Sequence, residues 1–406
     1  MRQNQHWQSQ CHTKKRKKQA WSITAFFLAL AWAGRCAEAQ FEFEAAPISY
    51  GKAPTSDAIH LLQERLNDGT STLEFDAEHG YLPAVLELLD IRLSSQVLVH
   101  SKTSLQLRRI SPSRPRAIYF NDDAAVGWVQ HGDVLELMAT DAVLGEVFYT
   151  LPQEEMAPPR FQRDRGQCMT CHASSRTKNV PGGLVRSVFS SASGQPQYNL
   201  GTFTIDHRSP FVDRWGGFYV TGTHGKMRHM GNTIYPDRVN PDTMDRDAGA
   251  NVEDLSDRFN VAPYLSKHSD IVALMVLEHQ TQMKNYLTLA SYESRSATHY
   301  DGVMNSALDR PAEYVSDTTK RRIASVSEKL LRYMFYVDEF QLTAPVKGTS
   351  TFATDFQSLG VRDRQGRSLR DLDLETRMFK FPCSYLIYSP LFDRLPASVK
   401  ANVASR

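Results

Sequence analysis

The segment 116–151, "RAIYFNDDAAVGWVQHGDVLELMATDAVLGEVFYTL", carries the pattern that decides the fold. Short runs rich in β-branched and aromatic residues alternate there with clusters of Asn, Asp and Gly. Runs of this kind, bounded by turn-forming residues, are typical of consecutive strands in an antiparallel sheet. Together with "QVLVH" (96–100) and "LQLRRI" (105–110), the pattern predicts an antiparallel meander over residues 95–151, with a tight connection at "HGD" (131–133).

Helical periodicity flanks the meander on both sides. Upstream, residues 56–69 place apolar side chains at helical spacing, and a second apolar run starts at Tyr81. Downstream, residues 269–295 and 318–340 predict two longer helices, the second of them amphipathic. The aromatic-rich tail, 379–396, is expected to pack back on the body of the protein. These patterns predict an α+β fold.

The amino terminus has the features of a secretory signal peptide. "KKRKK" (14–18) precedes a short apolar run, 21–33, and "AEA" (37–39) is a small-x-small cleavage site. The apolar run is short for a membrane span, which needs about 20 apolar residues, so an uncleaved anchor is the less favoured alternative. We expect export to the periplasm or elsewhere outside the cytoplasm, with no stable membrane span after cleavage.

Cleavage after residue 39 changes the charge of the chain. It removes seven Lys/Arg and one acid from totals of 47 and 45, leaving 40 basic and 44 acidic residues and a net charge of −4. The basic character of the full chain therefore lies mainly in the targeting segment, and no feature calls for nucleic acid as a partner. A mean hydropathy of −0.42 over the full chain fits a globular protein.

The stretch "RDRGQCMTCHAS" (163–174) contains the most specific motif of the chain. Cys168, Cys171 and His172 form C-x-x-C-H, the attachment signature of c-type haem. Two thiols at this spacing form thioethers with the two vinyl groups of the porphyrin, and the adjacent imidazole becomes the proximal iron ligand. This attachment takes place outside the cytoplasm, in agreement with the signal peptide. We therefore expect one covalent haem c.

Three other interpretations of the cysteine pair remain open. Half of a zinc site would need two further ligands in a matching arrangement, and a redox dithiol would need a thioredoxin-like frame. A structural disulfide or a chance match is the third. The remaining cysteine after residue 39, Cys383, is flanked by apolar residues and predicts a buried free thiol.

The sixth iron ligand would decide the chemistry. A histidine or methionine there gives a low-spin electron carrier, whereas an open position permits peroxide, dioxygen or small-ligand chemistry. Four candidates lie in the Gly-rich segment 214–232: His224, Met227, His229 and Met230. His279, on the apolar stripe of a predicted helix, is a rival that also fits a core histidine, and His207 is a weaker candidate.

Basic residues soon after the motif could pair with the haem propionates, or could equally be solvated surface charges. They are Arg176, Lys178 and Arg186. We accordingly divide the chain into a signal peptide (1–39), an α+β amino-terminal domain (40–152), an irregular haem c-binding region (153–262) and a mostly helical carboxy-terminal region (263–406).

Several motifs together carry a resemblance: "PRAIYFNDDAAVGWVQHGD", "CMTCHAS", "VPGGLVRSVF", "RWGGFYVTGTHGKMRHMGN" and "KFPCSYLIYSPLFDRLP". From about Pro47 to Pro396 the chain is similar to a group of large exported bacterial proteins described as cytochrome c domain-containing. The resemblance implies a single haem c on Cys168, Cys171 and His172, and it implies no particular substrate. A compact single-haem cytochrome c is far shorter than this chain, so that small helical fold need not be present intact.

Two functions from different classes follow. The first is a periplasmic c-type cytochrome that transfers electrons through an iron held by His172, with a redox partner protein or a small-molecule electron donor or acceptor. The second is a haem-dependent oxidoreductase, peroxidase-like or oxygenase-like, with an exchangeable distal position. Chain length favours the second, and the lack of a second C-x-x-C-H in the sequence counts against a peroxidase of the dihaem type. A sensor or docking module is a third possibility.

Overall fold

The computed structural model describes residues 41–236, 240 and 243–406. The predicted signal peptide, 1–39, lies outside the described residues, so its cleavage and the export of the protein stay predictions. Residues 43–406 form one compact unit, to which the following description refers. Strands and helices both build this unit, which confirms the predicted α+β class.

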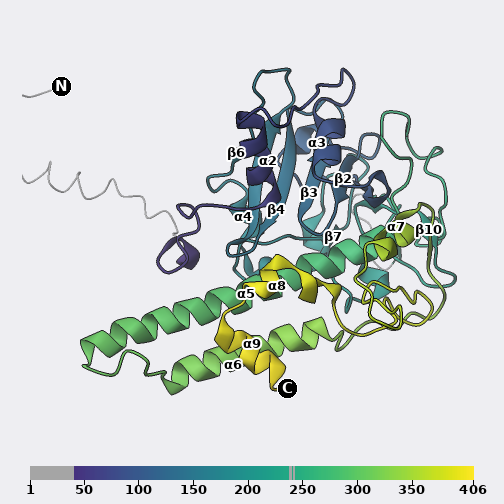
Figure 1. Cartoon of the computed structure of the whole chain (residues 1–406). Helices are drawn as coiled ribbons and strands as arrows, with labels where there is room; N and C mark the ends of the chain where they lie inside the picture. The colour runs from purple at the N-terminus through teal and green to yellow at the C-terminus, as the bar shows by residue number, and fades with distance from the viewer. Residues whose placement is uncertain (1–40, 237–239, 241–242) are drawn as a thin grey trace, which may run out of the picture. The chain divides into compact units, whose positions relative to one another are not determined.

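The predicted antiparallel meander is confirmed with one exception, and it forms the centre of a seven-stranded sheet (Figure 1). The exception is the run 105–110, where Leu105 and Leu107 are exposed and Leu107–Arg109 forms a 3-10 helix instead of a strand. Its five consecutive strands pair antiparallel with their neighbours: β1 (Val97–Val99), β2 (Arg116–Phe120), β3 (Ala124–Trp128), β4 (Val134–Asp141) and β5 (Gly145–Pro152). Two short strands from the middle of the chain extend the sheet at its edges, β6 (Gln162–Arg163) beside β5 and β9 (Phe218–Tyr219) beside β1.

The two faces of the sheet contact different parts of the chain. Because side chains alternate along a strand, Phe148 and Tyr149 of β5 point to opposite faces. The Tyr149 hydroxyl donates a hydrogen bond of 2.6 Å to Asp57, the N-cap of helix α2 (Ala58–Asn67). On the other face, the ring of Phe148 lies 4.7 Å from that of His172. The cysteine motif therefore sits on the face away from α2.

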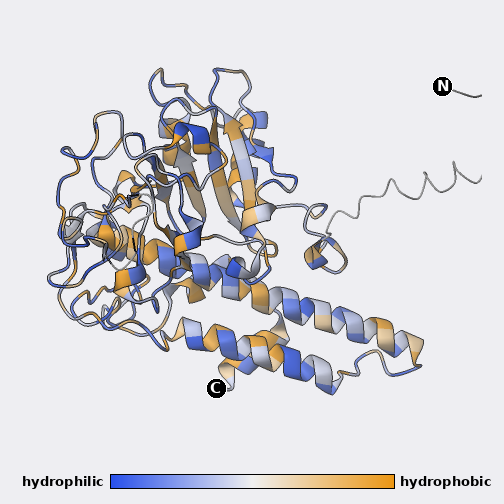
Figure 2. Cartoon of the chain, turned by 180° about the vertical axis from the view of Figure 1, so that it is seen from behind, coloured by the Kyte–Doolittle hydropathy of each residue, from blue (hydrophilic) through white to orange (hydrophobic). Residues whose placement is uncertain are grey.

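Helix α5 (Ile271–Ala307) is the longest helix and carries the core of the carboxy-terminal part. The Asp270 side chain caps its first turn by accepting from the amides of Val272 and Ala273. Residues 271–288 are buried on all sides of the helix, which explains the strongly apolar pattern of the predicted segment. The second half of α5 lies beside α6 (Asp317–Met334), and Figure 2 shows polar and apolar residues mixed along this pair.

The predicted helix ends differ from the observed ones. Helix α5 continues 12 residues beyond the predicted end at 295, to Ala307, where its contacts with α6 stabilise a polar stretch that has weak apolar periodicity. Helix α6 ends at Met334, six residues before the predicted end, because the backbone turns into the left-handed region at Tyr336 (φ 57°) and Asp338 (φ 66°).

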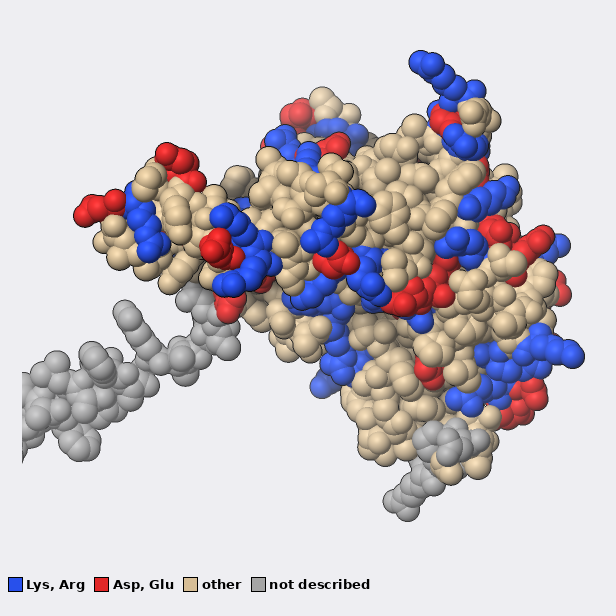
Figure 3. All heavy atoms as spheres, turned by 90° about the horizontal axis from the view of Figure 1, so that it is seen from below, with Lys and Arg blue, Asp and Glu red and all other residues tan. Residues whose placement is uncertain are grey.

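The remaining elements are short. They are α3 (Leu82–Leu88), α4 (Met169–His172), β7 (Arg186–Val188), β8 (Thr202–Thr204), β10 (Gly222–Thr223), β11 (Lys347–Gly348), α7 (Phe352–Ser358), α8 (Pro390–Asp393) and α9 (Ala397–Ala404). The predicted packing of the tail is confirmed, since Phe379, Tyr385 and Leu391 are at most 2% exposed. In the part of the chain that the structure describes, no helix combines the length and apolar character that crossing a membrane requires. Lys/Arg and Asp/Glu side chains are interspersed over the face seen in Figure 3.

Candidate functional site

The C-x-x-C-H motif forms a single helical turn, α4, that begins just after Cys168. The turn is held at its start by Asp164, whose carboxylate accepts hydrogen bonds from the amides of Gly166 (2.9 Å) and Cys168 (3.0 Å). Both cysteines are free thiols, with Cys168 half-buried and Cys171 exposed. Burial, and next the carboxylate of Asp164, raise the pKa of the Cys168 thiol to about 12. The two cysteines thus lie at a surface turn.

His172 is oriented by a reciprocal pair of hydrogen bonds with Gly182. Nδ1 of the imidazole lies 2.9 Å from the carbonyl oxygen of Gly182, and the amide of Gly182 donates to the carbonyl of His172, also at 2.9 Å. A carbonyl can only accept, so Nδ1 carries the ring proton and Nε2 has the free lone pair. Burial lowers the pKa of His172, which keeps the ring neutral. A neutral ring with its Nδ1 proton engaged is the form in which histidine binds metals.

The loop after the motif is closed by one buried hydroxyl. Oγ1 of Thr177 lies within hydrogen-bond distance of three carbonyl oxygens, those of His172 (3.2 Å), Ser174 (3.0 Å) and Val180 (2.9 Å). It also accepts a hydrogen bond of 3.1 Å from the amide of Ser174. Because Thr177 is fully buried, these bonds hold residues 172–180 in one conformation.

Helix α5 sets the position of this loop through two glycines. The side chain of Asn285 donates a hydrogen bond of 2.9 Å to the carbonyl of Gly183. A Cβ atom on Gly182 would lie 2.0 Å from Oδ1 of Asn285, and one on Gly183 would lie 2.7 Å from a methyl of Thr281. Only glycine allows the loop to approach the helix so closely. The contact with α5 therefore fixes the carbonyl that orients His172.

An ion pair on the sheet lies close to the motif. Arg116 of β2 and Glu136 of β4 are 2.9 Å apart, and both act electrostatically on His172. Nε of Arg116 is buried and has no hydrogen-bond partner among the described residues. A buried, unsatisfied guanidinium nitrogen favours an anionic group at this place, such as a haem propionate. The sequence contained no signal for Arg116, which is far upstream of the motif.

The basic residues predicted for the propionates have different surroundings. Arg176 is exposed. The ammonium of Lys178 lies 5.0 Å from the ring centre of Tyr286. The guanidinium of Arg186 lies 4.4 Å from the ring centre of Tyr198. Arg186 and Lys178 thus already rest on aromatic faces, which are favourable positions for cations.

The two predicted distal ligands lie in a cluster of their own. His224 and His229 are buried with ring centres 4.7 Å apart. Nε2 of His224 accepts from the amide of Asn251, and Nδ1 of His229 accepts from the amide of Gly231, each at 3.0 Å. Burial lowers the pKa of both rings, that of His229 to about 3. The lone pairs of these two rings thus accept hydrogen bonds from backbone amides. Their role as iron ligands stays a prediction.

The other candidate ligands are core residues in the structure. Met227 and Met230 are buried, the second with its sulfur 3.6 Å from the hydroxyl of Ser187. His279 is fully buried and its Nδ1 lies 2.9 Å from Nδ1 of His207. Both nitrogens of His279 have hydrogen-bond partners, as the interpretation as a core histidine requires.

The other interpretations of the cysteine pair stay predictions. Within the described residues, no group of three or more His, Cys, Asp or Glu side chains that could hold a metal ion is found. Cys383 is half-buried and free. Comparison of the chain with protein-family models, with curated proteins and with solved structures finds no match.

Proposed function

We propose that this protein is an exported c-type cytochrome that carries one haem on Cys168 and Cys171, with His172 as proximal ligand, and functions in electron transfer. One observation carries the proposal. Directly beside two free thiols, the bond from Nδ1 of His172 to Gly182 leaves Nε2 with its lone pair available for iron. Haem c would supply a one-electron redox centre at this turn.

The surroundings of the turn support the same group. The Gly182 carbonyl makes the imidazole of His172 more basic and fixes its orientation, as a second-shell acceptor does for histidine ligands. The ring of Phe148 lies against that of His172 and restricts its rotation. Nε of Arg116 offers an unsatisfied donor for a carboxylate. These residues would bind and orient the group.

The test is expression in a bacterium that contains a haem c maturation system. We expect the intact chain to gain the mass of one haem and to show the pyridine haemochrome spectrum of thioether-linked haem. The double substitution Cys168→Ser, Cys171→Ser should abolish both signals, and Cys383→Ser is the matched control that should keep them. Lack of covalent haem on the wild-type chain, while another cytochrome c matures in the same cells, would refute the proposal.

Export belongs to the same proposal and has its own measurement. Amino-terminal sequencing of the protein from the periplasmic fraction should begin at Gln40 if cleavage follows residue 39. Recovery of the protein in the membrane fraction with residues 1–39 intact would instead support an anchor.

A second candidate function is a haem-dependent oxidoreductase with an exchangeable distal position. The hydrogen bonds that His224 and His229 accept from backbone amides favour this function. Each ring would have to give up its hydrogen bond or change tautomer before it could bind iron. A ferric low-spin spectrum that cyanide and carbon monoxide leave unchanged would support the carrier. A high-spin spectrum that peroxide alters would support the oxidoreductase. His224→Gln and His229→Gln, studied separately, would show whether either ring contributes to the low-spin band.

A further inference from the structure

A group of tyrosine and histidine side chains, which we term the Tyr–His cluster, lies in the core between α5 and the end of α6. It consists of His207, His279, Tyr333 and Tyr336, all at most 4% exposed. The ring of His279 is nearly parallel to those of both tyrosines, with ring centres 5.6 Å from Tyr333 and 4.6 Å from Tyr336 and interplanar angles of 6° and 16°. His279 and His207 were candidate iron ligands in the sequence, but neither function proposed above uses the residues of this cluster.

The hydrogen bonds of the cluster determine where its protons lie. The hydroxyl of Tyr336 is 2.9 Å from Nε2 of His279, and Nδ1 of His279 is 2.9 Å from Nδ1 of His207. The hydroxyl of Ser384 also lies 2.9 Å from Nε2 of His279, and it accepts from the amide of Leu386. If Nε2 of His279 accepts from Tyr336, then Nδ1 donates to His207, and Nε2–H of His207 lacks a partner among the described residues. The opposite arrangement would leave the buried Tyr336 hydroxyl without an acceptor as well. The first arrangement costs less because it leaves fewer buried groups unsatisfied.

His279 is therefore a neutral base that faces a buried phenol. Burial lowers the pKa of His279 well below its ordinary value and raises that of Tyr336 well above, so proton transfer does not occur in the resting state. Loss of an electron from the phenol changes this balance, because an oxidised phenol is a far stronger acid. The proton then has an acceptor 2.9 Å away, and a second imidazole behind it.

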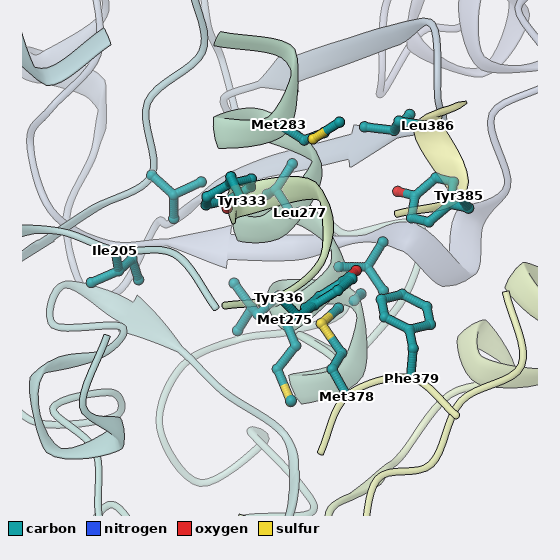
Figure 4. Packing of buried hydrophobic residues seen from close by; sticks show 14 of the residues in the cluster. Ile205, Met275, Leu277, Met283, Tyr333, Tyr336, Met378, Phe379, Tyr385 and Leu386 are labelled. Atoms are coloured by element: carbon teal, nitrogen blue, oxygen red, sulfur yellow. The ribbon is translucent and has the colours of Figure 1, made fainter. Parts of the chain in front are cut away.

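The surroundings of Tyr336 would protect an oxidised ring. Its neighbours in Figure 4 include Met275, Met378 and Phe379, each at most 2% exposed. The ring of Phe379 lies 5.6 Å from that of Tyr336. Because these side chains exclude water and external reductants, a radical formed here would decay more slowly than one on a surface tyrosine.

A chain of aromatic contacts links the cluster to the loop that follows the cysteine motif. The ring of Tyr286 lies 4.9 Å from that of Tyr333, and the ammonium of Lys178 lies 5.0 Å from the ring centre of Tyr286. Lys178 follows His172 by six residues, in the loop that Thr177 closes. Successive ring centres along Tyr286, Tyr333, His279 and Tyr336 are thus less than 6 Å apart.

We propose that Tyr336 is a redox-active tyrosine that loses one electron to a one-electron oxidant while its phenolic proton passes to Nε2 of His279. The products are a neutral phenoxyl radical, an imidazolium shared with His207 and the reduced oxidant; reduction of the radical returns the proton. The inference rests on the proposed function only for the physiological oxidant, which would be a one-electron acceptor bound at Cys168, Cys171 and His172. The aromatic chain ends at Tyr286, beside Lys178 of the loop that follows this motif. The tyrosine–histidine pair itself is independent of it.

The test generates the oxidant by light, so that no bound cofactor is needed. The full chain, made with and without covalent haem, is flashed with ruthenium tris-bipyridine and persulfate, and the radicals are followed by electron paramagnetic resonance. We expect a long-lived neutral tyrosyl signal in the wild-type chain and its loss in Tyr336→Phe, which keeps the ring. The matched control is Tyr300→Phe, because Tyr300 is 61% exposed; this variant should keep the signal.

A second variant separates the redox role from a packing role. His279→Gln retains a hydrogen-bond acceptor but no base, so the long-lived signal should be lost while circular dichroism shows that the variant is folded. A signal that survives in Tyr336→Phe, or that is absent from the wild-type chain, would overturn the inference. Failure of haem attachment with a normal radical would refute only the proposed function, and a haem-loaded chain without the radical would refute only the present inference.

Discussion

The structure predicts that one buried histidine makes the protein sensitive to acid. His100 follows strand β1, is fully buried, and its Nε2 has no hydrogen-bond partner among the described residues. Its Nδ1 has a long contact of 3.4 Å with Ser190, and its ring lies 4.9 Å from that of Tyr219. Burial, and to a smaller extent the charge of Arg258, lower the pKa of His100 from 6.5 to about 3.

The direction of the effect follows from where the protons bind. Between the two pKa values of His100 the unfolded chain holds a proton that the folded chain does not, so acid favours unfolding. The contribution of His100 to stability is complete above pH 6.5 and decreases as the pH falls toward 3. Each pH unit in this range costs about 1.4 kcal/mol, so lowering the pH from about 7.5 to about 5 should cost about 2 kcal/mol from this residue.

The assay is guanidinium unfolding at the two pH values, followed by tryptophan fluorescence, for the wild-type chain and for His100→Phe. The variant keeps a ring against Tyr219 and cannot titrate. Other buried groups also respond to pH, including Glu278, whose pKa burial raises to about 7, but they are common to both proteins and cancel in the comparison. We expect the wild-type protein to lose about 2 kcal/mol more than the variant on acidification. Equal losses in the two proteins would refute the reasoning.

Three further predictions concern the site and the core. Burial, and next the carboxylate of Asp164, raise the pKa of the Cys168 thiol, and Asp164→Asn removes that carboxylate. In the chain expressed without haem, alkylation of Cys168 at mildly alkaline pH should therefore become faster, as mass spectrometry of the labelled peptide would show. An unchanged rate would contradict the contribution of Asp164. Gly182→Ala places a methyl group against α5. This substitution should lower the free energy of unfolding by about 1–3 kcal/mol and should also reduce haem attachment. Wild-type stability together with wild-type haem attachment would contradict the close contact between the loop and α5. Arg214→Ala leaves the side chain of Glu278 buried without its ion-pair partner. The free energy of unfolding should fall by about 3–5 kcal/mol in the same denaturant assay. A loss below about 1 kcal/mol would indicate that the pair is not buried as described.

Much of the architecture was predictable because it depends on local pattern. The strands of the meander are separated by short turns, so the runs of β-branched and aromatic residues identify both their order and their antiparallel pairing. The start of α5 was predictable from its apolar run and from Asp270, which caps it. Strand β9 was not, since a strand of two residues is too short to show a period and joins β1 only through pairs such as Leu98 with Tyr219.

In the candidate site, too, some features were predictable from the sequence and others were not. The spacing of Cys168, Cys171 and His172 lies within one helical turn, so the sequence alone identified these three residues as a unit. The ring position of His172 depends on Gly182, and the position of Gly182 depends on the face of α5 that carries Asn285. Neither partner could be inferred from spacing, because apolar packing is non-directional and does not tell which distant side chains will meet.

The sequence by itself thus determined the class of fold, the order of the meander strands and the haem c signature. All three depend on the periodicity and spacing of residues that are close together in the chain. Tertiary structure alone decided that Arg116 leaves an unsatisfied donor beside His172, and that Tyr336 meets His279 across 57 residues of chain. The physical reason is that these contacts form between separate elements. Their geometry is set by how the sheet, α5 and α6 pack together, and that packing is a property of the whole core.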